Sequence, residues 1–174
     1  MLLQERVTLA LIKPDITHVP EHQQKIFELI EKNGFKILGG GRPLLWGRAS
    51  AEKFYAEHRG RFFYQRLIAF MTSAPIIPMV LEKDNAVIEW RCVQLHYRVS
   101  LTAMCRKLMG PTHIRKSRKE FPESIRGQMA KSDTWNCVHG SGTCEQQIVR
   151  TKYSPVQTLW RRHCVRLRCT GQSF

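Results

Sequence analysis

The order of short apolar runs and amphipathic stretches is the feature that most restricts the fold of this chain. Val7–Ile12 is a short apolar run that stops at Lys13-Pro14-Asp15, which predicts a buried strand. Phe35–Leu38 and Ile76–Leu81 also have the pattern of strands. Helical patterns cover residues 21–33, 50–58, 62–72 and 85–91, so two helices separate the second strand from the third. This order predicts an α+β (α/β) sandwich of ferredoxin-like βαββαβ topology with an antiparallel sheet.

Single residues refine these predictions. The first helix has one broad apolar face, and Gly34 is placed to end it with a left-handed turn. The glycines at 39–41 indicate a bend or bulge in the second strand, which we expect to continue to Leu45. Ser50 is positioned to cap the next helix. The basic stretch 110–131 is expected to be irregular.

Length and composition favour one soluble globular domain. The chain has 174 residues, and none of its apolar runs approaches the ~18 residues needed to span a bilayer. The net charge of +14 suggests an anionic partner, such as a nucleotide phosphate, a nucleic acid or an acidic membrane, although a generally basic surface is an equal alternative. The six cysteines form no C-x-x-C pair, so a zinc site or a thioredoxin-like motif has only weak support from the sequence.

Two stretches differ from the rest of the chain in pattern. Residues 92–102 alternate apolar and polar side chains as a strand does, directly after a predicted helix start. In the tail, Ser154-Pro155 resembles a helix start, and the residues after it form a basic amphipathic helix pattern. Such a helix covers a core or contacts a partner or anionic lipid. Residues 92–106 and 142–174 together carry seven of the fourteen net positive charges.

A histidine and several cations are candidates for phosphate chemistry. His139 is followed by Gly140, and a neutral imidazole is nucleophilic near pH 7, although a histidine beside a glycine is more often structural. Arg126 beside Gly127 could approach a phosphate closely, or it could form a surface ion pair. Lys13 follows a strand, which is a common place for a binding residue and also for a solvated turn lysine.

Four blocks in this order resemble the nucleoside diphosphate kinase family. They are TLALIKPD at Thr8–Asp15, a long block at Phe54–Leu81, KLMGPT at 107–112 with SIRG at 124–127, and NCVHGS at Asn136–Ser141. The resemblance implies the α/β sandwich of that family. It also implies a two-step reaction, in which His139 takes the γ-phosphate of ATP or another nucleoside triphosphate and passes it to a nucleoside diphosphate, which supports CTP, GTP and UTP synthesis.

The resemblance also implies roles for the surrounding residues. It implies that Phe63 stacks on the base, that Lys13 and Asn136 bind the sugar hydroxyls, and that Tyr55 and Ser141 support the histidine. It implies that Arg106, Thr112 and Arg126 hold the phosphates. Mg²⁺ is expected to bind through the nucleotide phosphates rather than in a protein cage. Stacking without edge-specific bonds tolerates every base.

The chain departs from the family pattern in two places. Fifteen residues separate Trp90-Arg91 from Lys107, so either Arg91 or Arg106 is the phosphate ligand that precedes Lys107. Arg150 stands where the family has a glutamate that orients the histidine, and loss of such a partner lowers the rate of a histidine catalyst. A catalytically weak or inactive kinase-like binding subunit is therefore the alternative function.

We therefore expect a kinase domain at 1–141, interrupted by an insertion at 92–106, and an atypical basic tail at 142–174. No nucleic-acid-binding module is visible, so specific nucleic-acid binding is not expected. Homo-oligomers occur in the family and are expected as one form of this chain. The resemblance implies a mitochondrial location, and the lack of a visible presequence leaves a cytoplasmic one open.

Overall fold

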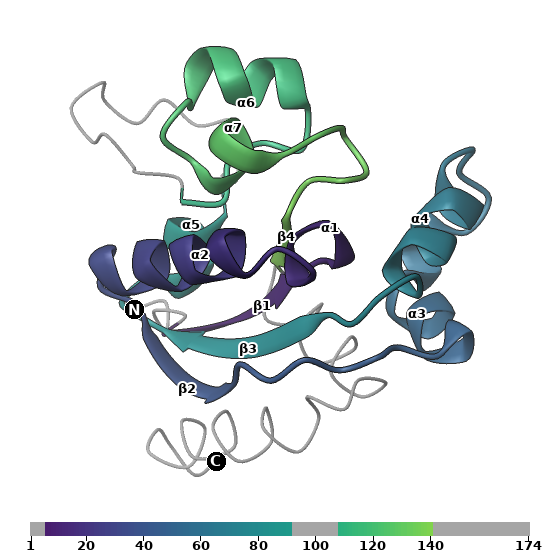
Figure 1. The fold of residues 1–174 in the computed structure, drawn as a ribbon, viewed down its shortest axis with the longest axis horizontal. Coiled ribbons are helices and arrows are strands. Elements are labelled where there is room, and N and C mark those ends of the chain that lie inside the picture. Colours follow the sequence, from purple (N-terminus) through teal and green to yellow (C-terminus); the bar gives the residue numbers. More distant parts are fainter. Residues whose placement is uncertain (1–5, 92–107, 141–174) are drawn as a thin grey trace, which may run out of the picture.

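The computed structural model describes residues 6–91 and 108–140, which form a four-stranded antiparallel sheet with helices on it (Figure 1). The strands are β1 (Val7–Ile12), β2 (Lys36–Gly40), β3 (Ile77–Glu82) and β4 (Val138–Gly140), in the order β2-β3-β1-β4. The antiparallel pairing and the places of the first three strands match the predictions, but β2 ends at Gly40 instead of continuing to Leu45. The sequence pattern did not reveal β4, because three residues are too few to show a period.

The side chains of β1 alternate between two hydrophobic cores. Ala10 and Ile12 belong to one core, and Leu9 and Leu11 belong to the other, as expected when successive residues of a strand point to opposite faces. The first core is covered by α1 (Pro14–Thr17), α2 (Pro20–Lys32), α5 (Ala86–Trp90), α6 (Ile114–Glu120) and α7 (Ile125–Met129). The second contains residues of α3 (Arg48–Phe54) and α4 (Tyr64–Met71). Both faces of β1 are therefore buried.

The end of α2 is closed as the sequence predicts. Gly34 has a φ of 75°, and the amide of Phe35 donates to the carbonyl of Ile30 at 3.1 Å. This left-handed glycine and the backward hydrogen bond form the C-terminal motif that commonly ends helices. The turn leads Phe35 into the core and directs the chain into β2.

The predicted bulge in the second strand is present. The pairing of β2 with β3 shifts register between Ile37 and Gly39, and Gly40 has a φ of 92°. A Cβ atom at Gly40 would overlap the carbonyl oxygen of Pro78, so the close approach of the two strands requires glycine. After the bulge, Leu44 forms an isolated antiparallel bridge with Ile76, the residue immediately before β3.

Two local predictions were wrong. The N-cap of α3 is Gly47 rather than Ser50, whose amide already donates to the carbonyl of Gly47. Residues 110–131 are not irregular, because they contain α6 and α7. These helices have seven and five residues, and α6 exposes most of its basic side chains, so an apolar period is hard to detect. Ser124 caps α7 by accepting a hydrogen bond from the amide of Gly127 at 3.0 Å.

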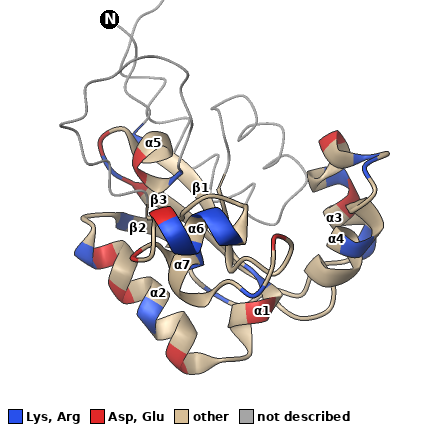
Figure 2. Cartoon of the chain, turned by 90° about the horizontal axis from the view of Figure 1, so that it is seen from above, with Lys and Arg blue, Asp and Glu red and all other residues tan. Residues whose placement is uncertain are grey.

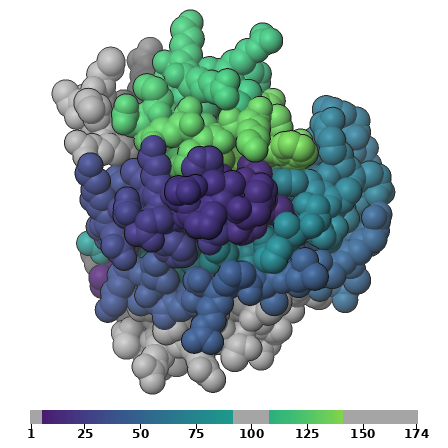
Figure 3. Space-filling view, viewed as in Figure 1, coloured from purple at the N-terminus to yellow at the C-terminus, as the bar shows by residue number. Residues whose placement is uncertain are grey.

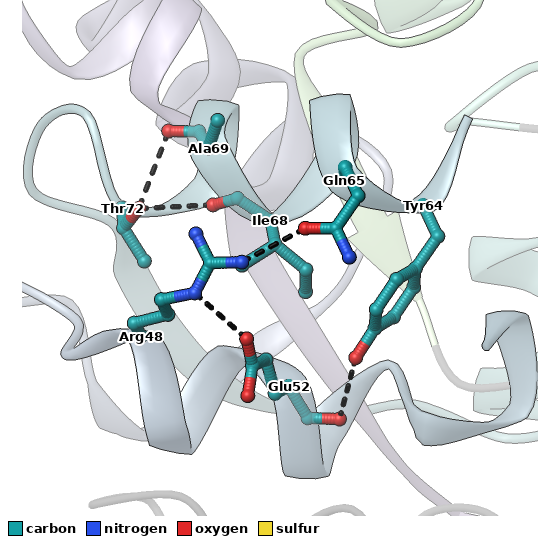
Figure 4. Close-up of polar contacts among 7 residues, drawn as sticks. All are labelled: Arg48, Glu52, Tyr64, Gln65, Ile68, Ala69 and Thr72. Atoms are coloured by element: carbon teal, nitrogen blue, oxygen red, sulfur yellow. Dashed lines mark hydrogen bonds and ion pairs between the residues drawn. The ribbon is translucent and has the colours of Figure 1, made fainter. Parts of the chain in front are cut away.

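The helices α3 and α4 lie at one end of the molecule (Figure 1), and polar contacts join them (Figure 4). The guanidinium of Arg48 contacts Glu52 of the same helix and Gln65 of α4, with both N–O distances 2.8 Å. Thr72 ends α4 by donating to the carbonyl of Ile68 at 2.9 Å. The short connection between α3 and α4 carries Tyr55 and Phe63, which are two of the predicted site residues.

The strand predicted at 92–102 and the amphipathic helix predicted in the tail lie outside the described residues. In the parts of the chain that the structure describes, every helix is too short or too polar to cross a membrane.

Candidate active site

Lys13 lies at the end of β1, where the first and last strands meet. Its side chain is only 4% exposed, and Nζ donates to Oδ1 of Asn136 at 2.7 Å. Its backbone amide donates to the carbonyl of Cys137 at 2.8 Å. In the space-filling view, the yellow-green segment that leads to Gly140 packs directly against the purple N-terminal segment (Figure 3). The contact brings together two motifs that are more than 120 residues apart.

The environment of Lys13 makes its proton easy to remove. Burial, and to a smaller extent the nearby charge of Arg126, lower the pKa of the amine from 10.5 to about 7, while Asp15 acts in the opposite direction. Nζ also lies 5.9 Å from the centre of the Phe70 ring, within cation–π range. A phosphate placed beside this amine would supply a nearby negative charge and would therefore favour the protonated form of Lys13.

Arg126 is a buried hub of hydrogen bonds. Its guanidinium donates to the carbonyls of Asn136, Gly110 and Val138 at 3.2, 2.9 and 2.9 Å, and to the hydroxyl of Thr112 at 3.2 Å. Burial lowers its pKa to about 10. Arg126 thus fixes the backbone on both sides of Cys137 and holds Thr112 at the exposed rim. Its role as a phosphate ligand stays a prediction.

His139 is the central residue of β4 and pairs with Leu11 of β1. Its side chain is partly exposed, and its ring meets those of Phe54 and Tyr55 edge-on, at centroid distances of 5.2 and 5.7 Å. The indole nitrogen of Trp90 donates to the carbonyl of His139 at 3.4 Å. The backbone of His139 is therefore held in the sheet and against α5, while its ring reaches the surface.

A series of aromatic rings leads from His139 toward the tip of the α3–α4 pair. Tyr55 stacks on His58 with centroids 6.0 Å apart, and His58 contacts Phe63 at 5.5 Å. Phe63 is partly exposed and immediately precedes α4. The structure therefore places the ring predicted to stack on a base within one connected group of rings that includes the candidate nucleophile.

The structure describes Arg91 but not Arg106 or Ser141. A Cβ atom added at Gly140 would lie 3.1 Å from Cγ of Arg91, and the charge of Arg91 contributes to the lowered pKa of Arg126. Arg91 is therefore near the other candidate cations. The choice between Arg91 and Arg106 as the phosphate ligand stays open.

Glycines beside the functional residues serve protein packing. A Cβ atom at Gly127 would overlap the carbonyl of Phe121, and one at Gly140 would overlap the indole of Trp90. The close approach that the sequence suggested at these glycines is thus made by the chain itself.

Basic residues are also used for structure in α6. Several positions on α6 are Lys or Arg and are blue in Figure 2. Arg118 donates to the carbonyl of Ala130 at 3.1 Å, and Lys116 lies 3.8 Å from Glu120.

Three residues at the site had no predicted role. Oδ2 of Asp15 accepts the amide of Cys137 at 3.0 Å, and Cys137 has a φ of 69°. Trp135 is half-exposed and stacks on Phe70 at 5.9 Å. Asp15 lies in the matched block TLALIKPD, which is a signal for a role. Cys137 likewise lies in the matched block NCVHGS, whereas no comparable signal marked Trp135.

Charge and donor type show which ligand this arrangement suits. Lys13, Arg91 and Arg126 supply positive charge, and Asn136 and Thr112 supply polar groups. The described residues include no group of three His, Cys, Asp or Glu side chains that could hold a metal ion. The cations and polar groups of the site therefore suit an anion with several oxygens.

Comparison with known proteins identifies the same family as the sequence motifs do. The profile of the family described as nucleoside diphosphate kinase matches residues 6–98. The rat protein nucleoside diphosphate kinase 6 is 41% identical over 136 residues, which cover 78% of this chain and 69% of the rat protein. This chain belongs to the nucleoside diphosphate kinase family. The human nucleoside diphosphate kinase 6 is 40% identical over 136 residues, which cover 78% of this chain and 64% of the human protein.

Solved structures of nucleoside diphosphate kinases share the fold. The enzyme of Aquifex aeolicus superposes with a TM-score of 0.72 and 28% identity, covering 87% of this chain and 96% of that one. The enzyme of Halobacterium salinarum, solved in complex with CDP, superposes with a TM-score of 0.66 and 27% identity, covering 85% and 87%. The predicted ferredoxin-like fold of the family is therefore confirmed.

Proposed function

We propose that this chain is a nucleoside diphosphate kinase that uses His139 as the phosphate carrier. Membership of the family supports a kinase of this type. One observation supports the carrier role: the partly exposed His139 lies on β4, directly beside the end of β1 that presents the buried Lys13, Asn136 and Arg126 group.

In the first step, a ring nitrogen of His139 attacks the γ-phosphorus of ATP or another nucleoside triphosphate. The bond from that phosphorus to the β–γ bridging oxygen breaks, and the nucleoside diphosphate leaves. A second nucleoside diphosphate then takes the group from the phosphohistidine, which yields CTP, GTP or UTP. Cations near the transferred group spread its charge, so Lys13 and Arg126 suit this task.

The residues present fit a metal that is brought by the nucleotide. Mg²⁺ in such sites takes few protein ligands and would be held mainly by the phosphates of the nucleotide. When bound, it neutralises charge on the phosphates. The chain's own contribution is to position the sugar through Lys13 and Asn136, the base through Phe63 and the phosphates through Thr112 and an arginine.

Labelling with γ-³²P ATP tests the proposal. The wild-type chain is expected to gain an acid-labile label that GDP removes, because a phosphohistidine is both acid-labile and transferable. His139→Ala should remain unlabelled, while His22→Ala, which changes a histidine on α2, should label as the wild type does.

Two results would contradict the proposal. Labelling that persists in His139→Ala would place the carrier elsewhere. A wild type that binds nucleotide but gains no label would instead support the alternative, a binding subunit of the kinase fold.

A further inference from the structure

A strained turn separates the two key side chains of the site. The amide of Val138 donates to the carbonyl of Asn136 at 2.7 Å, and the residue between them, Cys137, has a φ of 69°. A hydrogen bond across three residues with a positive central φ defines a γ-turn of the rare, strained type. A non-glycine residue keeps such a conformation only when its surroundings enforce it. Asn136 is the first residue of this turn, and His139 follows its last residue directly.

Neighbouring groups enforce the turn from both sides. The backbone of Cys137 accepts from the amide of Lys13 at 2.8 Å and donates to Oδ2 of Asp15 at 3.0 Å. Arg126 donates to the carbonyls of Asn136 and Val138. Asp15 is the only acceptor in the described residues that the amide of Cys137 contacts, and its carboxylate is 5% exposed. The other carboxylate oxygen, Oδ1, is buried and has no hydrogen-bond partner within the described part of the chain.

We propose that Asp15 is a positioning residue that holds the Cys137 turn and thereby sets His139 relative to Lys13 and Asn136. The inference rests on the proposed function, since it concerns the same site. Without the carboxylate, the amide of Cys137 would be buried without an acceptor, which is costly. The strained φ would then relax toward negative values. That rotation moves Asn136 relative to β4, and displacements of about 1 Å at a reacting centre lower rates by about 100-fold.

A second explanation gives Asp15 a different task. Its negative charge favours the protonated form of Lys13, so Asp15 could serve mainly as the counter-charge of that amine. The two explanations differ for Asp15→Asn. An asparagine side-chain oxygen still accepts the Cys137 amide but carries no charge, whereas Asp15→Ala removes both the acceptor and the charge.

The test combines Asp15 variants with variants at Cys137. Glycine adopts a positive φ without strain, whereas alanine at 137 is strained as cysteine is and loses a similar amount of packing. Cys137→Ala is therefore the matched control for Cys137→Gly. Asp15→Ala is made in the wild type and in both of these backgrounds, and far-UV circular dichroism confirms that each protein is folded.

The first measurement is hydrogen–deuterium exchange of the amide of residue 137, resolved by fragmentation mass spectrometry. Exchange should be about 10- to 100-fold faster in Asp15→Ala than in the wild type, because the amide loses its acceptor. In Asp15→Asn it should stay within about 3-fold. Equal exchange in the wild type and Asp15→Ala would overturn the proposal without reference to any activity.

The second measurement is the single-turnover rate of His139 phosphorylation at saturating ATP. Asp15→Ala should lower this rate about 10- to 100-fold in the Cys137→Ala background and less than about 5-fold in the Cys137→Gly background. Equal losses in both backgrounds, or an Asp15→Asn rate as low as that of Asp15→Ala, would overturn the positioning role. An unlabelled wild type would refute the proposed function and the catalytic consequence together, while the exchange rates would still decide whether Asp15 holds the turn.

Discussion

The buried amine of Lys13 is expected to affect stability and ligand affinity in opposite directions as the pH rises. Its folded pKa is about 7, whereas an amine in the unfolded chain keeps a value near 10.5. Between these values the unfolded chain binds more protons than the folded one, so the free energy of unfolding rises with pH. The protonated amine that favours a phosphate is the form that burial disfavours.

We expect the wild type to gain stability relative to Lys13→Met as the pH rises from 7 to 9. The gain should be about 1 kcal/mol per pH unit, since one pKa unit corresponds to about 1.4 kcal/mol. Nucleotide affinity of the wild type should fall by about 10-fold over the same range, because the neutral amine loses a charge-assisted bond. Urea unfolding and calorimetric titration at each pH measure the two effects. Parallel pH curves for the two proteins would show that Lys13 keeps its proton.

At this scale the sequence was most informative where a motif supplied the residue. Lys13, Asn136 and His139 were predicted from TLALIKPD and NCVHGS, and the structure brings the first two into contact. The sequence could not predict that Asp15 accepts the amide of Cys137, because the two residues are 122 positions apart. A positive φ at a cysteine has no recognisable sequence pattern either. Tertiary contacts alone determine that conformation.

Among the elements, β4 depends on a close contact with α5. Gly140 lies against the indole of Trp90, which also donates to the carbonyl of His139. The strand was missed from the sequence because its three residues lie within a motif that was interpreted for chemistry. The helices α6 and α7 were missed because each has few apolar residues and α6 has many basic ones. Elements with longer apolar runs, such as β1 and β3, were predicted to within one residue at each end.

Gly140→Ala should destabilise the protein by about 1–3 kcal/mol, because the added methyl group overlaps Trp90 and must displace β4 or α5. The labelling rate of His139 should fall as well, since its carbonyl is held by the same indole. Urea unfolding measures the first effect. Gly47→Ala is the control, because a Cβ atom there meets nothing within 4 Å. A Gly140→Ala protein as stable as that control would show that Trp90 moves freely.

At the scale of the whole molecule, a backbone hydrogen bond joins the two described parts of the chain, residues 6–91 and 108–140. The amide of Met109 donates to the carbonyl of Trp90 at 3.2 Å. If residues 92–106 were deleted, Met109 would be the fourth residue after Trp90, which is the spacing of an α-helical hydrogen bond. Trp90 and Met109 therefore already make the hydrogen bond that a continuous helix would contain, while Arg91 next to Trp90 is extended and would have to become helical.

A chain lacking residues 92–106 should fold, with a free energy of unfolding within about 1 kcal/mol of the full chain, since loop length affects closure entropy only weakly. Urea unfolding followed by tryptophan fluorescence measures the difference. A chain in which a glycine-serine linker of equal length replaces 92–106 separates the effect of length from that of sequence. A deletion variant that fails to fold would show that these residues contribute to the core.

The pairing of the last described strand with the first has a consequence for biosynthesis. The ribosome delivers β1, β3 and most of the helices long before it delivers β4, and domains generally fold as units while the N-terminal part emerges first. Lys13 cannot contact Asn136 until the end of the domain has been made, so a nascent chain lacks the complete nucleotide site that we propose. A nucleotide bound at this proposed site would stabilise the finished protein, but it could not assist the early steps of folding.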